Sequence, residues 1–152
     1  MPTRLVQLAA GNDRGVEAHV ALRCMLWDDL TRSESLQEAT QILNSARCAV
    51  LLACNEDDGS YVGFAELNLR DYAEGASSSP VGYLEGWFVL PEWRGRGVGR
   101  QLVDEGEQWA RSHGCTEFAS DTDLGNTGSI QAHGRLGFRE VERIVCFLKP
   151  LR

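Results

Sequence analysis

The sequence predicts a single α/β domain over residues 1–152, with helices covering a mixed, mostly antiparallel sheet. A chain of 152 residues has the size of one typical domain and is too short for two independent cores. Segments with strand-like alternation and segments with helical spacing follow in the order β-α-α-β-β-β-α-β-α-β. Only the late strand-helix-strand crossover requires parallel pairing.

The first half of the chain predicts a strand, two helices and a hairpin. Weak alternation indicates a strand over 3–9, and apolar residues at helical spacing predict helices over 16–30 and 33–43. Ser33 or Ser35 is the expected cap of the second helix. Around the turn that contains Asp58-Gly59, two further strands are expected over the ranges 49–54 and 61–70.

The second half predicts the crossover. The nearly continuous apolar run over 81–90 indicates a strand buried on both faces, which should be central in the sheet. A helix is expected over 98–113, ending before Gly114. The remaining elements are a short strand, a helix and a closing strand, over 116–120, 126–136 and 139–149.

Composition limits the classes of partner. The formal charge of −7 disfavours nucleic acids and anionic membranes and favours a polycationic ligand, although it also serves solubility alone. No segment approaches the ~20 apolar residues of a membrane helix. The five cysteines are scattered, with no CxxC pair, which indicates free thiols in a reducing, cytoplasmic compartment rather than disulfides or a metal site.

A glycine-rich turn between a strand and a helix is the most informative stretch. Gly95, Gly97 and Gly99 let backbone N–H groups approach an anion, and the helix start adds partial positive charge. Three arginines stand among these glycines although the whole chain is acidic: Arg94, Arg96 and Arg100. The pattern predicts a diphosphate ligand, and the alternative is a turn that only tightens the joint between strand and helix.

Two other phosphate-binding motifs fit less well. A P-loop ends in Gly-Lys-Ser/Thr, which this turn lacks. A dinucleotide fingerprint needs GxGxxG in an early βαβ unit, whereas these glycines run GxGxG at mid-chain. The stretch from Arg94 to Gly99, after Val89-Leu90-Pro91, resembles the acetyl-coenzyme A signature (Q/R)xxGx(G/A) of the GCN5-related N-acetyltransferases (GNAT), and Gly137-Phe138 matches their "GF" after the last helix.

Within that superfamily the chain is most similar to the aminoglycoside 6′-N-acetyltransferases. The resemblance is carried by the residues of 72–80, Leu84-Glu85-Gly86, Phe88 to Pro91, Ala119 to Thr122, Asn126 and Glu142-Arg143. It implies acetyl transfer from acetyl-CoA to the 6′-amine of an aminoglycoside, antibiotic inactivation and a homodimer. It also implies a set of cofactor-binding residues: Trp87, Phe88, Val89, Arg94, Gly95, Arg96, Gly97, Val98, Gly99, Arg100 and Asn126.

The same resemblance implies an acceptor site whose members are Trp27, Tyr72, Glu85, Asp121 and Glu142. Carboxylates suit a polyammonium substrate, and one amine must lose its proton before it attacks the thioester, so Asp121 and Glu85 are the candidate catalytic residues. Structural roles compete with these assignments: Asn126 could be a helix cap, Asp121 a turn residue, and Glu85 and Glu142 solvated strand residues.

Two positions depart from the family pattern. His133 stands where many members have a tyrosine that can protonate the departing thiolate, and a structural histidine is the alternative. Leu30 stands where the aminoglycoside enzymes are expected to have a histidine. The predicted reaction is direct transfer in a ternary complex, without a covalent acyl-enzyme on a cysteine. Another cationic amine, such as a polyamine or a protein N-terminus, and a non-catalytic acetyl-CoA-binding module are the alternatives.

Overall fold

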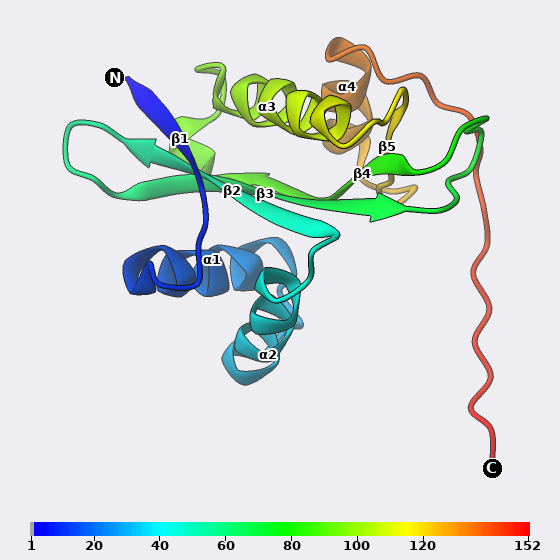
Figure 1. The fold of residues 1–152 in the computed structure, drawn as a ribbon, viewed down its shortest axis with the longest axis horizontal. Coiled ribbons are helices and arrows are strands. Elements are labelled where there is room, and N and C mark those ends of the chain that lie inside the picture. The colour runs from blue at the N-terminus through cyan, green and yellow to red at the C-terminus, as the bar shows by residue number, and fades with distance from the viewer. Residues whose placement is uncertain (1) are drawn as a thin grey trace.

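A twisted five-stranded sheet with the strand order β1-β2-β3-β4-β5 forms the centre of the molecule (Figure 1). The structure is a computed structural model and describes residues 2–152. Its elements are β1 (Thr3–Gln7), α1 (Asp13–Leu26), α2 (Arg32–Leu43), β2 (Cys48–Asn55), β3 (Tyr61–Arg70), β4 (Val81–Val89), η1 (Pro91–Trp93), α3 (Val98–Ser112), β5 (Phe118–Ser120) and α4 (Thr127–Arg135).

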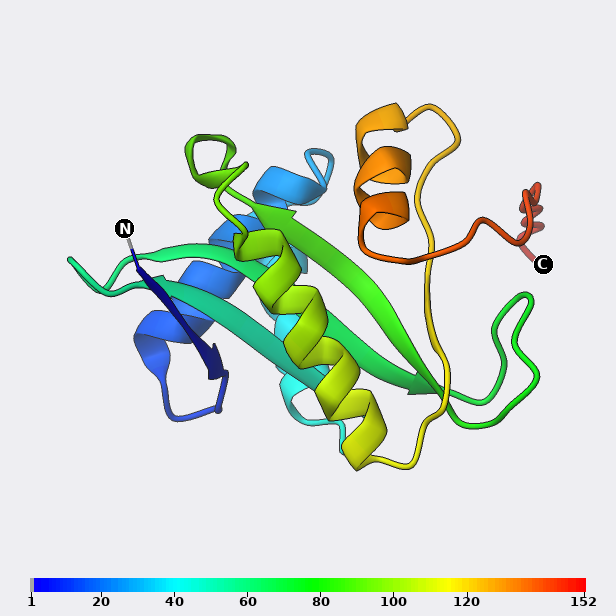
Figure 2. The same ribbon diagram turned by 90° about the horizontal axis from the view of Figure 1, so that it is seen from above.

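Helices cover both faces of this sheet. Helices α1 and α2 lie under one face, whereas α3 crosses the other face with α4 beside it (Figures 1 and 2). On the α3 side, Leu102 and Val103 pack with Leu67 of β3, and all three are buried. On the α1 side, Leu22 packs with Phe64. Burial of apolar side chains on both faces of one sheet stabilises the three layers together.

The pairing of the strands confirms the predicted fold class. Strands β1 to β4 pair antiparallel in chain order, and β5 joins β4 in parallel after the α3 crossover. One detail of the prediction is wrong: β3, rather than β4, is the middle strand. Strand β4 is nevertheless mostly buried, because α3 packs on one of its faces and Phe88 joins the buried cluster of Leu22 on the α1 side.

A β-bulge in β4 sets the directions of its side chains. Glu66 of β3 pairs with Gly86, but the next residue, Leu67, pairs with Leu84, so Glu85 is the extra residue. An extra residue reverses the alternation of side chains beyond it. Leu84 therefore packs on the α3 side, and after the bulge Trp87 also packs on that side.

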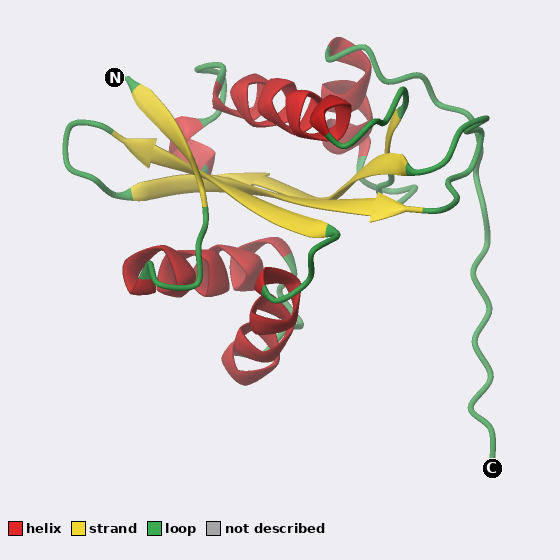
Figure 3. Cartoon of the chain, in the orientation of Figure 1, coloured by secondary structure: helices red, strands yellow, loops and turns green. Residues whose placement is uncertain are grey.

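The predicted closing strand over 139–149 is wrong. Residues 136–152 form neither helix nor strand, and the end of the chain runs away from the sheet as an extended segment (Figure 3). Its apolar side chains are exposed, with Phe147 and Leu148 at 92% and 95%. The sequence has an apolar run over 144–148, but within residues 2–152 this segment pairs with no strand.

The predicted cap of α2 is also wrong. Thr31 caps the helix in a capping box, in which its hydroxyl accepts from the Glu34 N–H and the Glu34 carboxylate accepts from the Thr31 N–H. Ser35 is instead buried and donates a hydrogen bond to the Val20 carbonyl. Within residues 2–152, no helix combines the length and apolar character needed to cross a bilayer.

Candidate active site

A groove of about 800 Å³ runs between β4, the glycine-rich turn, the loop after β5 and α4. Most of the predicted site residues line it together, although they are distant in sequence: Trp27, Glu85, Trp87, Phe88, Val89, Arg94, Gly95, Gly97, Gly99, Arg100, Asp121 and Asn126. Of the predicted set, Arg96, Val98, Tyr72 and Glu142 do not line it.

The glycine-rich turn forms an open cradle at one end of the groove. Gly95 and Gly97 have φ angles of +76° and +83°, a region that residues with a Cβ rarely adopt, and a Cβ at either would meet nothing within 4 Å. Gly97 is the N-cap of α3 and offers no side chain to the N–H groups of the first turn. These amides and the helix dipole can therefore bind an anion such as a pyrophosphate.

The three arginines of the turn have different surroundings. The Arg94 Nε donates to the Val89 carbonyl at 2.9 Å, and Arg96 stacks over Trp93 with its guanidinium carbon 4.8 Å from the ring centroid. Arg100 reaches the carbonyl of Arg135 at 3.4 Å. Arg135, on α4, lines the groove and is a cation that sequence reasoning missed. Val98 is buried in the α3 core.

Strand β4 presents a free backbone edge to the groove. It pairs with β5 only from Gly82 to Leu84, because β5 ends at Ser120 while β4 continues to Val89. Beyond Leu84 the edge that faces β5 therefore has no strand partner in the part of the chain that the structure describes. The Trp87 indole donates to the Gly99 carbonyl at 3.2 Å and fixes the start of α3 against this strand.

Asp121 follows the end of β5 and is held by Tyr83 of β4. The Tyr83 hydroxyl donates to Asp121 Oδ2 at 2.5 Å. Burial raises the pKa of Tyr83 far above its usual range. The hydrogen bond to Asp121 and the negative charge of that carboxylate raise it further. Tyr83 is thus a permanent donor at neutral pH. Asp121 Oδ1 has no hydrogen-bond partner among the described residues and can accept from a ligand.

Replacing Tyr83 with phenylalanine should lower the free energy of unfolding by about 1.5–3 kcal/mol at pH 8, the usual range for a hydrogen bond to a charged group. Because the folded-state pKa is raised, the contribution of Tyr83 is complete below the ordinary value of 10.0 and is lost as the pH rises above it. Denaturant unfolding of both proteins at pH 8 and near pH 11 should show a smaller difference at the higher pH. A constant difference would contradict the assignment.

Glu85 is anchored by two residues of β3. Its carboxylate accepts two hydrogen bonds from the Arg70 guanidinium, at 2.6 and 2.8 Å, and one from the Asn68 amide at 3.0 Å. Hydrogen bonding and the charge of Glu85 raise the pKa of Arg70. Arg70 also stacks on the Tyr83 ring at 3.5 Å. The two predicted carboxylates, Glu85 and Asp121, are thus joined through Arg70 and Tyr83, neither of which sequence reasoning found.

Trp27 lies at the end of α1 and lines the groove, but two other predicted acceptor residues lie elsewhere. Tyr72 is 69% exposed in the loop between β3 and β4. Glu142 is exposed on the extended C-terminal segment. Neither lines the groove of its own chain.

Asn126 and His133 both have structural partners. Asn126 is the N-cap of α4 and accepts from the Ser129 N–H at 3.1 Å, as the alternative reading expected. His133 Nδ1 lies 2.7 Å from the Ser129 carbonyl, Nε2 lies 2.8 Å from the Ser120 hydroxyl, and the ring packs edge-on against Trp87. Both ring nitrogens are therefore engaged, although both residues line the groove.

The model of the acetyltransferase (GNAT) family matches residues 19–138. The chain belongs to this family. The match includes the glycine-rich turn, β4 and α4, and so covers every residue that lines the groove. The free backbone edge and open phosphate cradle of this GNAT protein suit an extended nucleotide thioester. No group of three or more metal-ligating side chains occurs among residues 2–152.

Proteins similar to this GNAT chain are described as aminoglycoside N(6′)-acetyltransferases. The chain is 49% identical to an aminoglycoside N(6′)-acetyltransferase type 1 of Stenotrophomonas maltophilia, over 88% of this chain and 86% of the relative. It is 48% identical to one of Klebsiella aerogenes, over 87% and 88%. Among solved structures, AAC(6′)-Iy in complex with the bisubstrate analogue CoA-S-monomethyl-acetylneamine has a TM-score of 0.91 at 36% identity, covering 99% of this chain and all of that one.

Proposed function

We propose that this GNAT enzyme transfers the acetyl group of acetyl-CoA to the 6′-amine of aminoglycosides and thereby confers antibiotic resistance. The observation that carries the proposal is the position of Asp121 and Glu85 in the same groove as the phosphate cradle. This arrangement supports a polycationic acceptor next to a nucleotide thioester. The relatives that carry the aminoglycoside 6′-acetyltransferase description, at up to 49% identity, support the same substrate.

Acetyl-CoA would lie along the free edge of β4. The amides of residues 95–100 would bind the pyrophosphate, with Arg100 and Arg135 adding positive charge. The unpaired backbone around Trp87 and Phe88 would bind the pantetheine arm as an added strand would. Asn126, already a helix cap, is proposed as a further contact.

The acceptor would bind where Trp27, Glu85 and Asp121 meet. Glu85 is neutralised by Arg70, so we assign it to anchoring an ammonium group. Asp121 is bonded only by the neutral Tyr83 hydroxyl and retains a free oxygen, so we assign it to the reacting amine, from which it takes a proton directly or through water. The free amine then attacks the thioester carbon, and the coenzyme thiolate leaves.

Direct transfer is favoured over a covalent acyl-enzyme. None of the five cysteines lines the groove, so none is placed to take the acetyl group. All five are free, as expected for a reducing cytoplasmic compartment, which we propose as the location of the enzyme.

Release of thiol tests the function. We expect mixing of the protein, acetyl-CoA and kanamycin to release free coenzyme A, with much lower kcat/KM for spermidine. Mass spectrometry should find a single acetyl group on the 6′-nitrogen. A large preference for spermidine would replace the aminoglycoside with a polyamine, and binding of both ligands without thiol release would indicate a non-catalytic module.

We also propose that the enzyme is a homodimer held by its C-terminal segments. Two features support this proposal. Residues 139–152 carry exposed apolar side chains in an extended segment, and the outer edge of β5 has no strand partner among the described residues. A second copy of the chain would cover the exposed apolar side chains and pair with the outer edge of β5. Glu142, which lies outside the groove of its own chain, would then serve the acceptor site of the other copy.

Sedimentation equilibrium tests the assembly. We expect the protein to sediment at twice its chain mass of 16.8 kDa. The double substitution of Phe147 and Leu148 by serine should give a monomer, because it removes two apolar side chains that are almost fully exposed in the single chain. A monomeric wild-type protein at micromolar concentration would contradict the proposal.

A further inference from the structure

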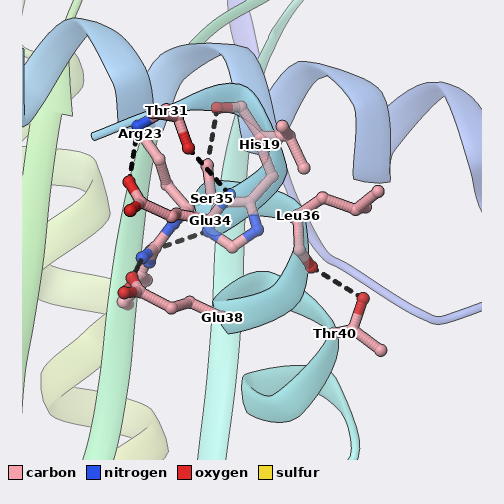
Figure 4. Close-up of polar contacts among 10 residues, drawn as sticks. His19, Arg23, Thr31, Glu34, Ser35, Leu36, Glu38 and Thr40 are labelled. Carbon is pink, nitrogen blue, oxygen red and sulfur yellow. Dashed lines mark hydrogen bonds and ion pairs between the residues drawn. The ribbon is translucent and has the colours of Figure 1, made fainter.

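Arg23 is a buried cation that joins three elements of the fold. It lies on α1 with 3% of its surface exposed, and its guanidinium pairs with Glu66 on β3 and with Glu38 on α2. Figure 4 shows Arg23 and Glu38 in this cluster, with the helices that carry them. A buried charge needs partners of opposite sign, and removing one partner is strongly destabilising. Arg23 therefore ties the pair α1 and α2 to the middle of the sheet.

His19 fixes the same carboxylate. Its Nε2 lies 2.8 Å from Glu66 Oε2, the oxygen that also accepts from Arg23. Because His19 and Arg23 are four residues apart, they lie one above the other on one face of α1. The two donors set the position of this helix on β3.

Arg23 also holds Trp27. Its guanidinium carbon stacks 4.8 Å from the centroid of the Trp27 ring, and its carbonyl accepts from the Trp27 N–H at 2.9 Å. On another side, Trp27 abuts β4 so closely that a Cβ at Gly86 would lie 2.7 Å from the indole. Trp27 is thus held between Arg23 and the strand that lines the groove.

A second cavity borders the groove at Trp27. It has a volume of about 660 Å³ and shares Trp27 and Glu85 with the groove. Its lining includes Arg23 and four carboxylates: Asp29, Glu38, Glu66 and Glu85. Arg23 is the only cation in that lining. Trp27 and Glu85 therefore lie at the border between the groove and this second cavity, whose lining is acidic.

We propose that Arg23 is a positioning residue for the acceptor, acting through Trp27 and held in place by Glu38 and Glu66. The inference rests on the proposed function, because it takes the aminoglycoside to bind against Trp27. A guanidinium can pair with two carboxylates and stack on an aromatic ring at the same time, which a lysine ammonium cannot do. Loss of this geometry should weaken acceptor binding and leave acetyl-CoA binding intact, since Arg23 does not line the cofactor groove.

Three variants test the proposal. Glu38→Gln removes the half-exposed partner on α2 and leaves the buried Arg23–Glu66 pair in place. Arg23→Lys keeps the positive charge but loses the planar, forked set of N–H donors of the guanidinium. The matched control is Glu17→Gln, which breaks the other ion pair between α1 and α2, Arg32–Glu17, at exposed positions outside both cavities.

The expected result is a rise in KM for kanamycin of about threefold in Glu38→Gln and about tenfold in Arg23→Lys, since small displacements of positioning groups have large kinetic effects. KM for acetyl-CoA should stay constant, and Glu17→Gln should match the wild type. Calorimetric titration of kanamycin into the protein–coenzyme A complex should rank the variants in the same order by their loss of kanamycin affinity. This measurement also works for a variant with low turnover.

Each other outcome overturns the proposal. Equal KM values for kanamycin in Glu38→Gln, Arg23→Lys and wild type would show that Arg23 positions nothing. Parallel changes in both KM values would show that it serves folding alone. Wild-type protein that neither binds nor acetylates kanamycin would instead overturn the proposed function, and the inference with it.

Discussion

Replacing Asp121 with asparagine is expected to lower kcat/KM for the aminoglycoside by about 10²–10⁴-fold, the usual contribution of a general base. The amide keeps the size of the side chain and can still accept from Tyr83, but it cannot take a proton or pair with an ammonium group. Because Asp121 is exposed and the amide still accepts from Tyr83, we expect the unfolding midpoint to fall by less than in Tyr83→Phe. Steady-state kinetics and thermal unfolding of the same preparations provide the measurement.

Two comparisons sharpen this test. Asp104→Asn changes the charge identically on the exposed side of α3, outside the groove, and should retain wild-type kinetics. The affinity of Asp121→Asn for acetyl-CoA, measured by calorimetry, should also equal that of the wild type. A tenfold or smaller loss of kcat/KM would mean that another group acts as the general base. Glu85 would then be the remaining candidate.

Replacing Gly97 with alanine is expected to weaken acetyl-CoA binding by about 10- to 100-fold, or about 1.4–2.7 kcal/mol. Gly97 has a φ of +83°, which costs an L-residue of order 1–2 kcal/mol. Relief of that strain would turn the backbone N–H groups of the turn away from the pyrophosphate. Calorimetric titration with acetyl-CoA measures the change directly.

Gly114 offers a matched control at the other end of the same helix. Its φ is +82°, and a Cβ there would also meet nothing within 4 Å. Gly114→Ala should therefore lose about as much stability as Gly97→Ala while keeping wild-type affinity for acetyl-CoA. Equal losses of affinity in the two variants would mean that the cradle responds only to general destabilisation.

The sequence alone predicted the parts of the molecule that depend on local order. The fold class, the hairpin of β2 and β3, and the length of α3 follow from periodicity and turn residues. The phosphate cradle could also be predicted, because three glycines followed by a helix determine a backbone shape within a few residues. Resemblance to the aminoglycoside enzymes then added Asp121, Glu85 and Trp27, which the structure brings to one groove.

Other features required tertiary structure because they depend on contacts between distant segments. The bulge at Glu85 leaves no signal in an apolar run, since it arises from the register of β3 against β4. The pairing of Glu85 with Arg70 and of Asp121 with Tyr83, and the bridging of α1, α2 and β3 by Arg23, likewise join residues 15 to 43 positions apart.

The C-terminal segment shows that a local sequence pattern is not enough to form a strand. The apolar residues of 139–149 predicted a strand that the structure does not form, because a local pattern cannot supply the partner strand. A strand exists only where another strand accepts its hydrogen bonds. Local sequence thus determined the shape of the glycine-rich turn, whereas tertiary contacts determined which charges face the groove, because ion pairs depend on distance in space.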